Sequence, residues 1–241
     1  MNLSQRSYEP ELLDRDDIPF ADIKLNMQEL DIVNTRLGGH AITIRGLIKL
    51  IGNRQQIHVC EIGCGGGNNL VALHNWCSKK KINASFTGID IKPACIDVAK
   101  QKTALLSHTQ WIISDYRTAQ FPRQPDIIFS SLFCHHFTDE QLITQLQWMR
   151  QHARVGFFIN DLHRHAIAYH SIRLITRLFS KSYLVKNDAP LSVRRGFIKK
   201  DWQRLMQVAG ITNYKLSWQW AFRWLLASPS VPLLPERDAP V

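Results

Sequence analysis

The chain has 241 residues, of which 45% are apolar, and its formal net charge is +10. This length fits one domain with a full core, and this composition excludes a disordered chain. No apolar run reaches the roughly 18 residues that a membrane helix needs, and the first residues lack the apolar stretch of a secretory signal. The five cysteines form no CxxC pair, which indicates reduced thiols. We therefore expect a cytoplasmic protein, whose charge favours an anionic partner without naming it.

The N-terminal part is expected to be an arm followed by two helices. Residues 1 to about 20 are polar and contain two prolines, which predicts a flexible arm. Apolar residues then recur at helical spacing from Asp22 to Leu37 and from Ile44 to Ile51. Glycines follow both segments and are natural helix ends.

From residue 53 onward, strand-like runs alternate with helix-like segments. Strands are expected at Ile57–Ile62, Ala84–Ile89, Gln110–Ile113, Asp126–Ser131, Val155–Ile159, Asn213–Trp218 and Ala221–Ala227. Helices are expected to begin near Asn68, Pro93, Thr138 and Asp201. Thr138 and Gln141 have the spacing of a capping box. The alternation predicts an α/β fold, with a parallel sheet and helices on both of its faces.

Residues 161–196 interrupt this alternation. One amphipathic helix is expected there, with Ala168, Ile172, Ile175 and Phe179 on one side. A long connection, SKSYLVKNDAPLSVRRGF, follows it. Long loops inside compact domains are often lids, so we expect a helical lid insert after the fifth strand. Residues 228–241 are expected to be a flexible tail.

The strongest motif is Glu61-Ile62-Gly63-Cys64-Gly65-Gly66-Gly67, between an expected strand and an expected helix. Glycines there let the backbone pass close to a ligand and adopt unusual φ and ψ angles. A dinucleotide-binding loop would need Gly or Ala where Asn68 stands, and a phosphate-binding loop would need a lysine after the glycines. The spacing is GxGxG. A glycine-rich turn without a ligand is the alternative interpretation.

Two acidic residues follow the next two expected strands. Asp90 ends the second strand, where α/β folds that bind nucleotides place a carboxylate that accepts hydrogen bonds from ribose hydroxyls. Asp115 follows the third strand, and its carboxylate can accept a hydrogen bond from an adenine amino group. The glycine loop and both acids fall at carboxyl ends of neighbouring strands, where ligands bind in open α/β sheets.

At these residues the sequence resembles the class I methyltransferase family, which uses S-adenosylmethionine. EIGCGGG resembles the family's first motif, GID its second, Ser114-Asp115 its third, and DIIFSSLFCHHFTDEQL its fourth with the helix beyond. The resemblance covers about residues 57–160 and extends more loosely to 227. It implies S-adenosylmethionine as cofactor and a Rossmann-like, seven-stranded, mostly parallel sheet. Residues 53–227 would form the methyltransferase domain, and residues 1–52 would cover its active site.

The same resemblance implies which residues bind the cofactor. Gly63, Gly65 and Gly67 would lie along its methionine part. Asp90 would hold the ribose, Asp115 the adenine amino group. Ile91 and Tyr116 would flank the adenine ring. The full expected set is Glu61, Gly63, Gly65, Gly67, Asp90, Ile91, Asp115, Tyr116 and Ser131.

Histidines supply the candidates for a general base. Methyl transfer depends mainly on positioning, which can supply up to about 7–11 kcal/mol, while a base typically adds a factor of about 10²–10⁴. His163 and His165, in NDLHRH, are the preferred catalytic candidates, and Asp161 is expected to orient one of them. His136, beside His135, is the third candidate, with simple packing as the alternative. No metal is expected, because nothing in the sequence fixes the geometry of the four histidines.

A looser resemblance concerns the methyl acceptor. LGGH, NDLHRH and DAPLSVRRGF are similar to segments of bacterial methyltransferases of secondary metabolism that act on phenolic or quinone-like molecules. It implies a small-molecule acceptor and O-methylation of an aromatic hydroxyl. Arginines could bind an acidic group of that acceptor, with a solvated basic surface as the alternative; they are Arg164, Arg173, Arg194 and Arg195.

Three alternatives stay open. C-methylation of a quinone precursor would use the same site. Methylation of RNA or another macromolecule is favoured by the charge, but the fourth strand ends in SSLF and not in the (N/D)PP(Y/F) motif for base amino groups. The third alternative is a binding protein that keeps the fold without catalysing transfer.

Overall fold

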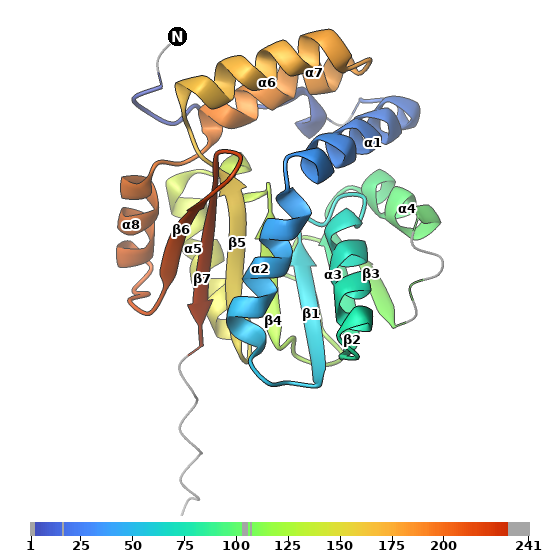
Figure 1. The fold of residues 1–241 in the computed structure, drawn as a ribbon, viewed down its shortest axis with the longest axis vertical. Helices are drawn as coiled ribbons and strands as arrows, with labels where there is room; N and C mark the ends of the chain where they lie inside the picture. The colour runs from blue at the N-terminus through green and yellow to red at the C-terminus, as the bar shows by residue number, and fades with distance from the viewer. Residues whose placement is uncertain (1–2, 16, 103–105, 107, 231–241) are drawn as a thin grey trace, which may run out of the picture.

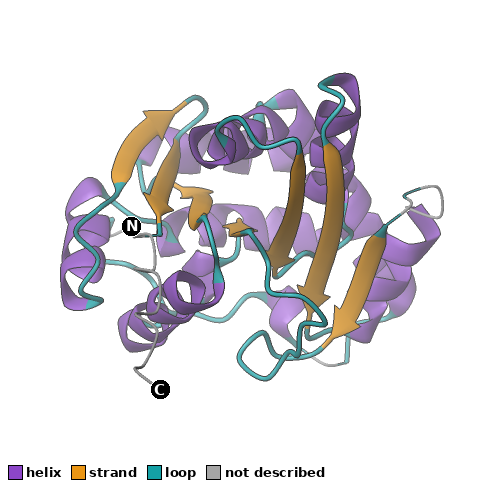
Figure 2. Ribbon diagram, turned by 90° about the horizontal axis from the view of Figure 1, so that it is seen from below, coloured by secondary structure: helices purple, strands orange, loops and turns teal. Residues whose placement is uncertain are grey.

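A computed structural model of the chain describes residues 3–15, 17–102, 106 and 108–230. Within them, seven strands form one sheet in the order β3-β2-β1-β4-β5-β7-β6 (Figures 1 and 2). The strands are β1 (Gln56–Ile62), β2 (Asn83–Asp90), β3 (Thr109–Ile113), β4 (Ile127–Ser131), β5 (Gly156–Leu162), β6 (Lys215–Gln219) and β7 (Arg223–Pro229). Strand β7 pairs antiparallel with both β5 and β6, whereas the described pairs among β1 to β5 are all parallel. The predicted seven-stranded, mostly parallel sheet is confirmed.

Helices lie on both faces of the sheet, as predicted (Figure 1). They are α1 (Phe20–Arg36), α2 (Gly39–Ile51), α3 (Asn68–Lys79), α4 (Pro93–Lys102), α5 (Asp139–His152), α6 (Ala166–Phe179), α7 (Tyr183–Arg195) and α8 (Lys199–Val208), with short 3-10 helices η1 (Leu12–Asp14) and η2 (Cys134–His136). The predicted capping box of α5 is confirmed, because the Thr138 hydroxyl accepts a hydrogen bond from the Gln141 amide at 3.3 Å.

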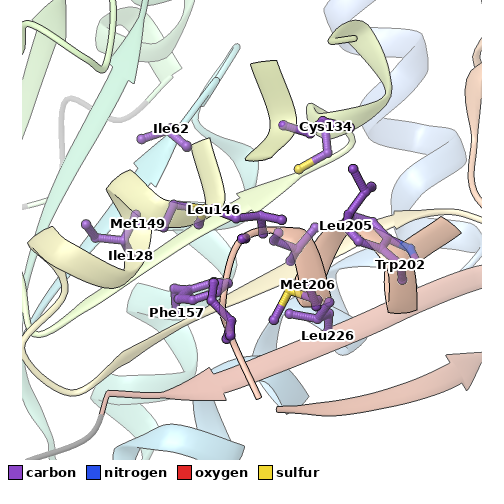
Figure 3. Close-up of a cluster of buried hydrophobic side chains, with 14 of the residues drawn as sticks. Ile62, Ile128, Cys134, Leu146, Met149, Phe157, Trp202, Leu205, Met206 and Leu226 are labelled. Carbon is purple, nitrogen blue, oxygen red and sulfur yellow. The ribbon is translucent and has the colours of Figure 1, made fainter. Parts of the chain in front are cut away.

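Two hydrophobic cores hold helices to the sheet. On one face, α2 and α3 pack against the strands through Leu47, Leu70 and Phe129 among others. On the other face, α5 and α8 do so through Leu146 and Trp202, as Figure 3 shows. Burying large aliphatic and aromatic side chains on both faces is what a largely parallel sheet requires. The carboxyl ends of the strands are therefore left free for loops.

The prediction of a long connection after α6 is wrong, because helix α7 occupies Tyr183–Arg195. The Ser182 hydroxyl caps the helix by accepting a hydrogen bond from the Val185 amide at 3.3 Å. Leu184 and Leu191, seven residues apart, are buried on one side of the helix. Pro190 and several polar residues make the segment resemble a loop, but burial of this apolar side favours the helix.

The N-terminal arm is not the flexible segment that its composition predicts. Arg6 is buried and donates hydrogen bonds to the Arg195 and Phe137 carbonyls, each at 3.0 Å. It also forms an ion pair with Asp139 at 2.7 Å. Residues 3–15 are thus fixed by polar contacts, which a hydrophobicity pattern does not reveal.

The C-terminal tail begins later than expected. Strand β7 continues to Pro229, and the Ser230 amide donates a hydrogen bond to the Val155 carbonyl at 2.8 Å. The rest of the predicted tail, residues 231–241, lies outside the described residues. None of the described helices is both long enough and apolar enough to cross a membrane.

Candidate active site

The glycine loop joins the end of β1 to α3 and depends on left-handed backbone. Gly63, Gly65 and Gly67 have φ angles of +66°, +49° and +73°. A Cβ atom on Gly63 would lie 2.2 Å from the Phe133 ring, and one on Gly67 would lie 2.4 Å from the Trp111 ring. Any larger residue would therefore combine backbone strain with a clash at these two positions.

Two cavities meet at this loop, at the carboxyl ends of the parallel strands. The smaller has a volume of about 320 Å³ and the larger about 730 Å³. Gly63, Asp90, Ile91, Phe133 and Phe137 line both. A two-part site of this kind can hold one ligand in each cavity, with their reactive ends meeting at the shared wall.

Asp90 stands at the junction of the two cavities. Its carboxylate accepts hydrogen bonds from the Gly65 and Lys92 amides, each at 2.9 Å. Burial raises the pKa of Asp90, and these two amides act in the opposite direction. Each carboxylate oxygen has a second acceptor position. Asp90 can therefore hold the glycine loop in place and still accept hydrogen bonds from ribose hydroxyls.

The smaller cavity contains the other residues expected at the adenine. The two Asp115 carboxylate oxygens share the Nε–H of Arg117, each at 3.0 Å, and the Arg117 guanidinium lowers the pKa of Asp115. An adenine amino group would have to share this carboxylate with Arg117. The buried Tyr116 ring packs against Trp148 with the ring centres 5.1 Å apart. Ile91 is 65% exposed and offers an apolar face to a ring.

Glu61 and Ser131 line the larger cavity next to the loop. Glu61 Oε1 accepts a hydrogen bond from Asn69 at 2.8 Å, whereas buried Oε2 has no partner among the described residues. Burial raises the pKa of Glu61 well above its usual value. A buried carboxylate oxygen without a partner is costly and fits a cationic group, such as the ammonium of a bound amino acid. The Ser131 hydroxyl accepts a hydrogen bond from Asn160 at 3.3 Å.

Gly67 is placed differently from the other two loop glycines. It is not among the described residues that line either cavity. Gly67 is the N-cap residue of α3, and its amide donates a hydrogen bond to the Cys64 carbonyl at 2.9 Å. The predicted contact of Gly67 with the methionine part is therefore not supported, and packing beneath Trp111 accounts for this glycine.

A cluster of histidines and acids lines the larger cavity on the side of η2. His135 Nδ1 lies 2.8 Å from Asp161, and its Nε2 lies 3.6 Å from Glu11. His136 Nε2 lies 3.9 Å from Glu11, and its Nδ1 lies 3.3 Å from Asp14. Asp161 was expected beside His163 or His165, but it contacts His135 instead. The acids of the N-terminal arm and the histidines of η2 thus form one charged cluster in the wall of the larger cavity.

The pKa of His135 predicts a pH-dependent stability. Burial alone would lower this pKa, but Asp161 and Glu11 raise it to about 9 from the usual 6.5. The resulting stabilisation is complete below pH 6.5 and is lost as the pH rises through 9. We expect His135→Gln to reduce the free energy of unfolding by on the order of 3 kcal/mol more near pH 6 than near pH 9.5, as measured by denaturant titration. Identical losses at both pH values would contradict this account of His135.

The same cluster has a donor set that could hold a metal ion. One ligand atom from each of Glu11, His135 and His136 lies within 4.8 Å of the others. Two imidazoles and a carboxylate suit several transition metals. The ion pairs with Asp161 and Asp14 account for the same arrangement without a metal. We therefore treat the cluster as a proton-handling group.

His163 and His165, the preferred candidates for the base, lie outside this cluster. His163 accepts a hydrogen bond from Trp218 at 3.2 Å. His165 caps α6 by accepting one from the Ile167 amide at 3.2 Å. Neither histidine is among the described residues that line the two cavities. Their catalytic role stays a prediction, and the geometry favours His136, which lines the larger cavity.

Three of the four candidate arginines are occupied by the protein itself. Arg164 pairs with Asp201 at 3.0 Å, and Arg194 pairs with Glu9 at 3.1 Å. Arg195 donates hydrogen bonds to the carbonyls of His135 at 3.0 Å and His136 at 2.7 Å. Arg195 therefore positions the histidine pair and is not free to bind an acceptor. Arg173, the fourth, is exposed on α6.

Arg223 is a cavity residue that the sequence does not single out. It is buried at the start of β7, lines the larger cavity and donates a hydrogen bond to Asn34 at 3.0 Å. Its Nη1 atom has no hydrogen-bond partner in the part of the chain that the structure describes. Burial lowers the pKa of Arg223 to about 10, and Asp161 acts in the opposite direction. Arg223 thus remains a cation at neutral pH.

Comparison with known proteins identifies the central part of the chain. Residues 59–156 match the family of methyltransferase domains. No curated protein matches the chain significantly. The matched segment contains most of β1, the glycine loop, Asp90, Asp115 and the histidine pair. It includes the described residues that line the smaller cavity, but only part of those that line the larger one.

Solved structures share the fold at low sequence identity. Human N-acetylserotonin methyltransferase, in complex with S-adenosylmethionine, is 16% identical, with a TM-score of 0.63 over 88% of this chain and 56% of that one. The plantazolicin methyltransferase BpumL, in complex with S-adenosylhomocysteine, is 16% identical, with a TM-score of 0.64 over 90% of this chain and 91% of that one. Magnesium protoporphyrin IX methyltransferase from Synechocystis is 15% identical, with a TM-score of 0.54 over 82% of each chain.

The chain spans little more than half the length of the human enzyme, so that enzyme's substrate does not transfer to it. Residues 59–156 thus match methyltransferase domains, and the described chain shares its fold with methyltransferases solved with S-adenosylmethionine or S-adenosylhomocysteine.

Proposed function

We propose that the protein methylates a hydroxyl group on a small aromatic or quinone-like molecule. The observation that carries this proposal is the larger cavity of about 730 Å³. It meets the cofactor loop at Gly63, and mostly apolar side chains of α1 and α6 line it, including Met27, Leu30 and Ile172. A flat apolar ligand fits such a cavity, and a few polar groups would then fix its orientation.

The cofactor would be held by the residues around the junction. Asp90 would accept hydrogen bonds from the ribose, Glu61 would receive the ammonium group, and Ile91 would cover the adenine. When bound, S-adenosylmethionine supplies a methyl group activated by a positively charged sulfur. The chain then has to align the acceptor with that methyl group and exclude water, which is the larger part of the catalysis.

His136 is the base that the cluster favours. His135 is held as a cation between Asp161 and Glu11, as its pKa of about 9 indicates, so it is not an acceptor of protons near neutral pH. His136 lines the cavity, with Asp14 near its Nδ1 and Glu11 near its Nε2. Imidazole is a common general base for a hydroxyl, and its place in the cavity wall would bring His136 close to a bound acceptor.

Arg223 would bind a second oxygen of the acceptor. Arg223 lines the cavity, and its buried Nη1 has no hydrogen-bond partner among the described residues, so an anionic or carbonyl oxygen of the acceptor would satisfy it. Hydroxyquinones and phenols with an adjacent oxygen carry such a group. This favours an oxygen-rich ring over a purely apolar one.

A screen of acceptors with labelled methyl donor tests the proposal. Phenols, quinols and total RNA would be incubated with the protein, and transfer would be measured in each fraction. We expect labelling of phenols or quinols and release of the label by ether cleavage. Labelling of RNA alone, or of a ring carbon, would replace the proposed acceptor. Cofactor binding without transfer to any acceptor would support a non-catalytic role.

A further inference from the structure

We propose that the outer face of helix α6 docks on an anionic lipid surface. Ile167, Leu174, Leu178 and Phe179 of this helix are each more than half exposed. The first three are seven and four residues apart, so they share one side of the helix. In Figure 1, α6 and α7 lie across the end of the molecule that carries the cofactor loop, with α6 outermost in that view.

The charge around this face is complementary to an anionic membrane. Residues 166–186 contain Arg173, Arg177, Lys181 and Lys186 and no Asp or Glu. Arg173 and Arg177 are exposed and lie one helical turn apart, along the flank of the apolar face. An amphipathic helix with exposed large apolar residues and basic flanks lies in the membrane interface, with the cations near the anionic headgroups.

The apolar face leads directly into the larger cavity. Ser171, Ile172 and Ile175 of α6 line that cavity, between the exposed apolar residues and the protein interior. Trp220, which is 67% exposed, lines the same cavity from the β6–β7 hairpin. Tryptophan is favoured at membrane interfaces because one side of it is apolar and the other polar. An acceptor dissolved in the lipid could therefore enter the cavity without crossing water.

A second copy of the chain is a poorer occupant for this face. In a two-fold dimer the same patch of each subunit meets itself. Arg173 and Arg177 of both copies would then face one another without an acidic partner from residues 166–186. The like charges oppose such a contact, whereas an anionic lipid surface neutralises them.

Flotation with lipid vesicles tests the proposal on the full chain. We expect the protein to bind vesicles of phosphatidylcholine mixed with phosphatidylglycerol, to bind pure phosphatidylcholine much less, and to lose binding as salt is added. The L174Q/L178Q and R173Q/R177Q variants should each bind roughly tenfold more weakly. The matched controls are V208Q on α8 and K79Q/K80Q at the far end of α3, which should bind as the unmodified chain does.

Two results would overturn the proposal. The first is absence of binding to the anionic vesicles, or equal binding by L174Q/L178Q and the unmodified chain. The second is a dimer in vesicle-free solution that L174Q/L178Q dissociates, because α6 would then be a protein interface. Calorimetric titration with S-adenosylmethionine, run on the same samples, separates these outcomes from a failure of the methyltransferase site or of folding.

Discussion

The Asp90→Ala variant is expected to bind S-adenosylmethionine about a hundredfold or more weakly than the unmodified chain. Two charge-assisted hydrogen bonds to ribose hydroxyls would be lost, each worth about 1.5–3 kcal/mol. The Gly65 and Lys92 amides, now 2.9 Å from the carboxylate, would also lose their acceptor. The glycine loop would then be held less firmly, which adds to the loss of affinity.

Isothermal titration calorimetry measures this effect directly. Asp97→Ala is the matched control, since Asp97 is an exposed acid on the neighbouring helix α4. The control should keep the affinity of the unmodified chain. If Asp90→Ala folds and binds the cofactor with unchanged affinity, the assignment of the ribose to Asp90 fails.

The His136→Ala variant is expected to lower kcat by a factor of about 10²–10⁴, the range of general-base catalysis. Cofactor affinity should change little, because Asp90, Glu61 and the glycine loop are intact. The measurement uses the acceptor found in the screen and compares kcat with the dissociation constant of the cofactor. A lower kcat with an unchanged dissociation constant of the cofactor would indicate that proton transfer, and not cofactor binding, has been lost.

His163→Ala is the informative comparison, because His163 is the base that the sequence favours. Its ring accepts a hydrogen bond from Trp218 and does not line a cavity in the described structure. We expect this variant to turn over at nearly the normal rate. If instead His163→Ala is slow and His136→Ala is normal, the base lies on the loop after β5 and our assignment is wrong.

The fold could be predicted from sequence because its signals are local. Alternating strands and helices, the Thr138 capping box and the glycine loop each depend on neighbouring residues, and all three are present. Helix α7 could not be predicted because its sequence favours a loop at Pro190, and only packing against α6 and the arm reverses that preference. Tertiary contacts often override local preference in this way.

In the candidate site, too, the residues that follow from local sequence signals could be predicted, and those that depend on distant contacts could not. Glu61, Gly63, Asp90 and Asp115 follow directly from strand ends, so their positions could be predicted. The contacts of Glu11 and Arg223 depend on segments far apart in the chain, and no spacing rule connects them to His136. The preference for His163 rested on its loop leading into the expected lid, and the position of a loop does not determine where a side chain points.

The ordered arm brings Glu11, Leu13 and Asp14 to the wall of the larger cavity. The Arg6 guanidinium donates a hydrogen bond to the Arg195 carbonyl, 189 positions away in the sequence, and Glu11 of the same arm lies 3.6 Å from His135. The order of the arm is therefore a condition for the Glu11 carboxylate to stand beside the histidine pair. Loss of the Arg6 contacts is expected to disturb this corner of the larger cavity.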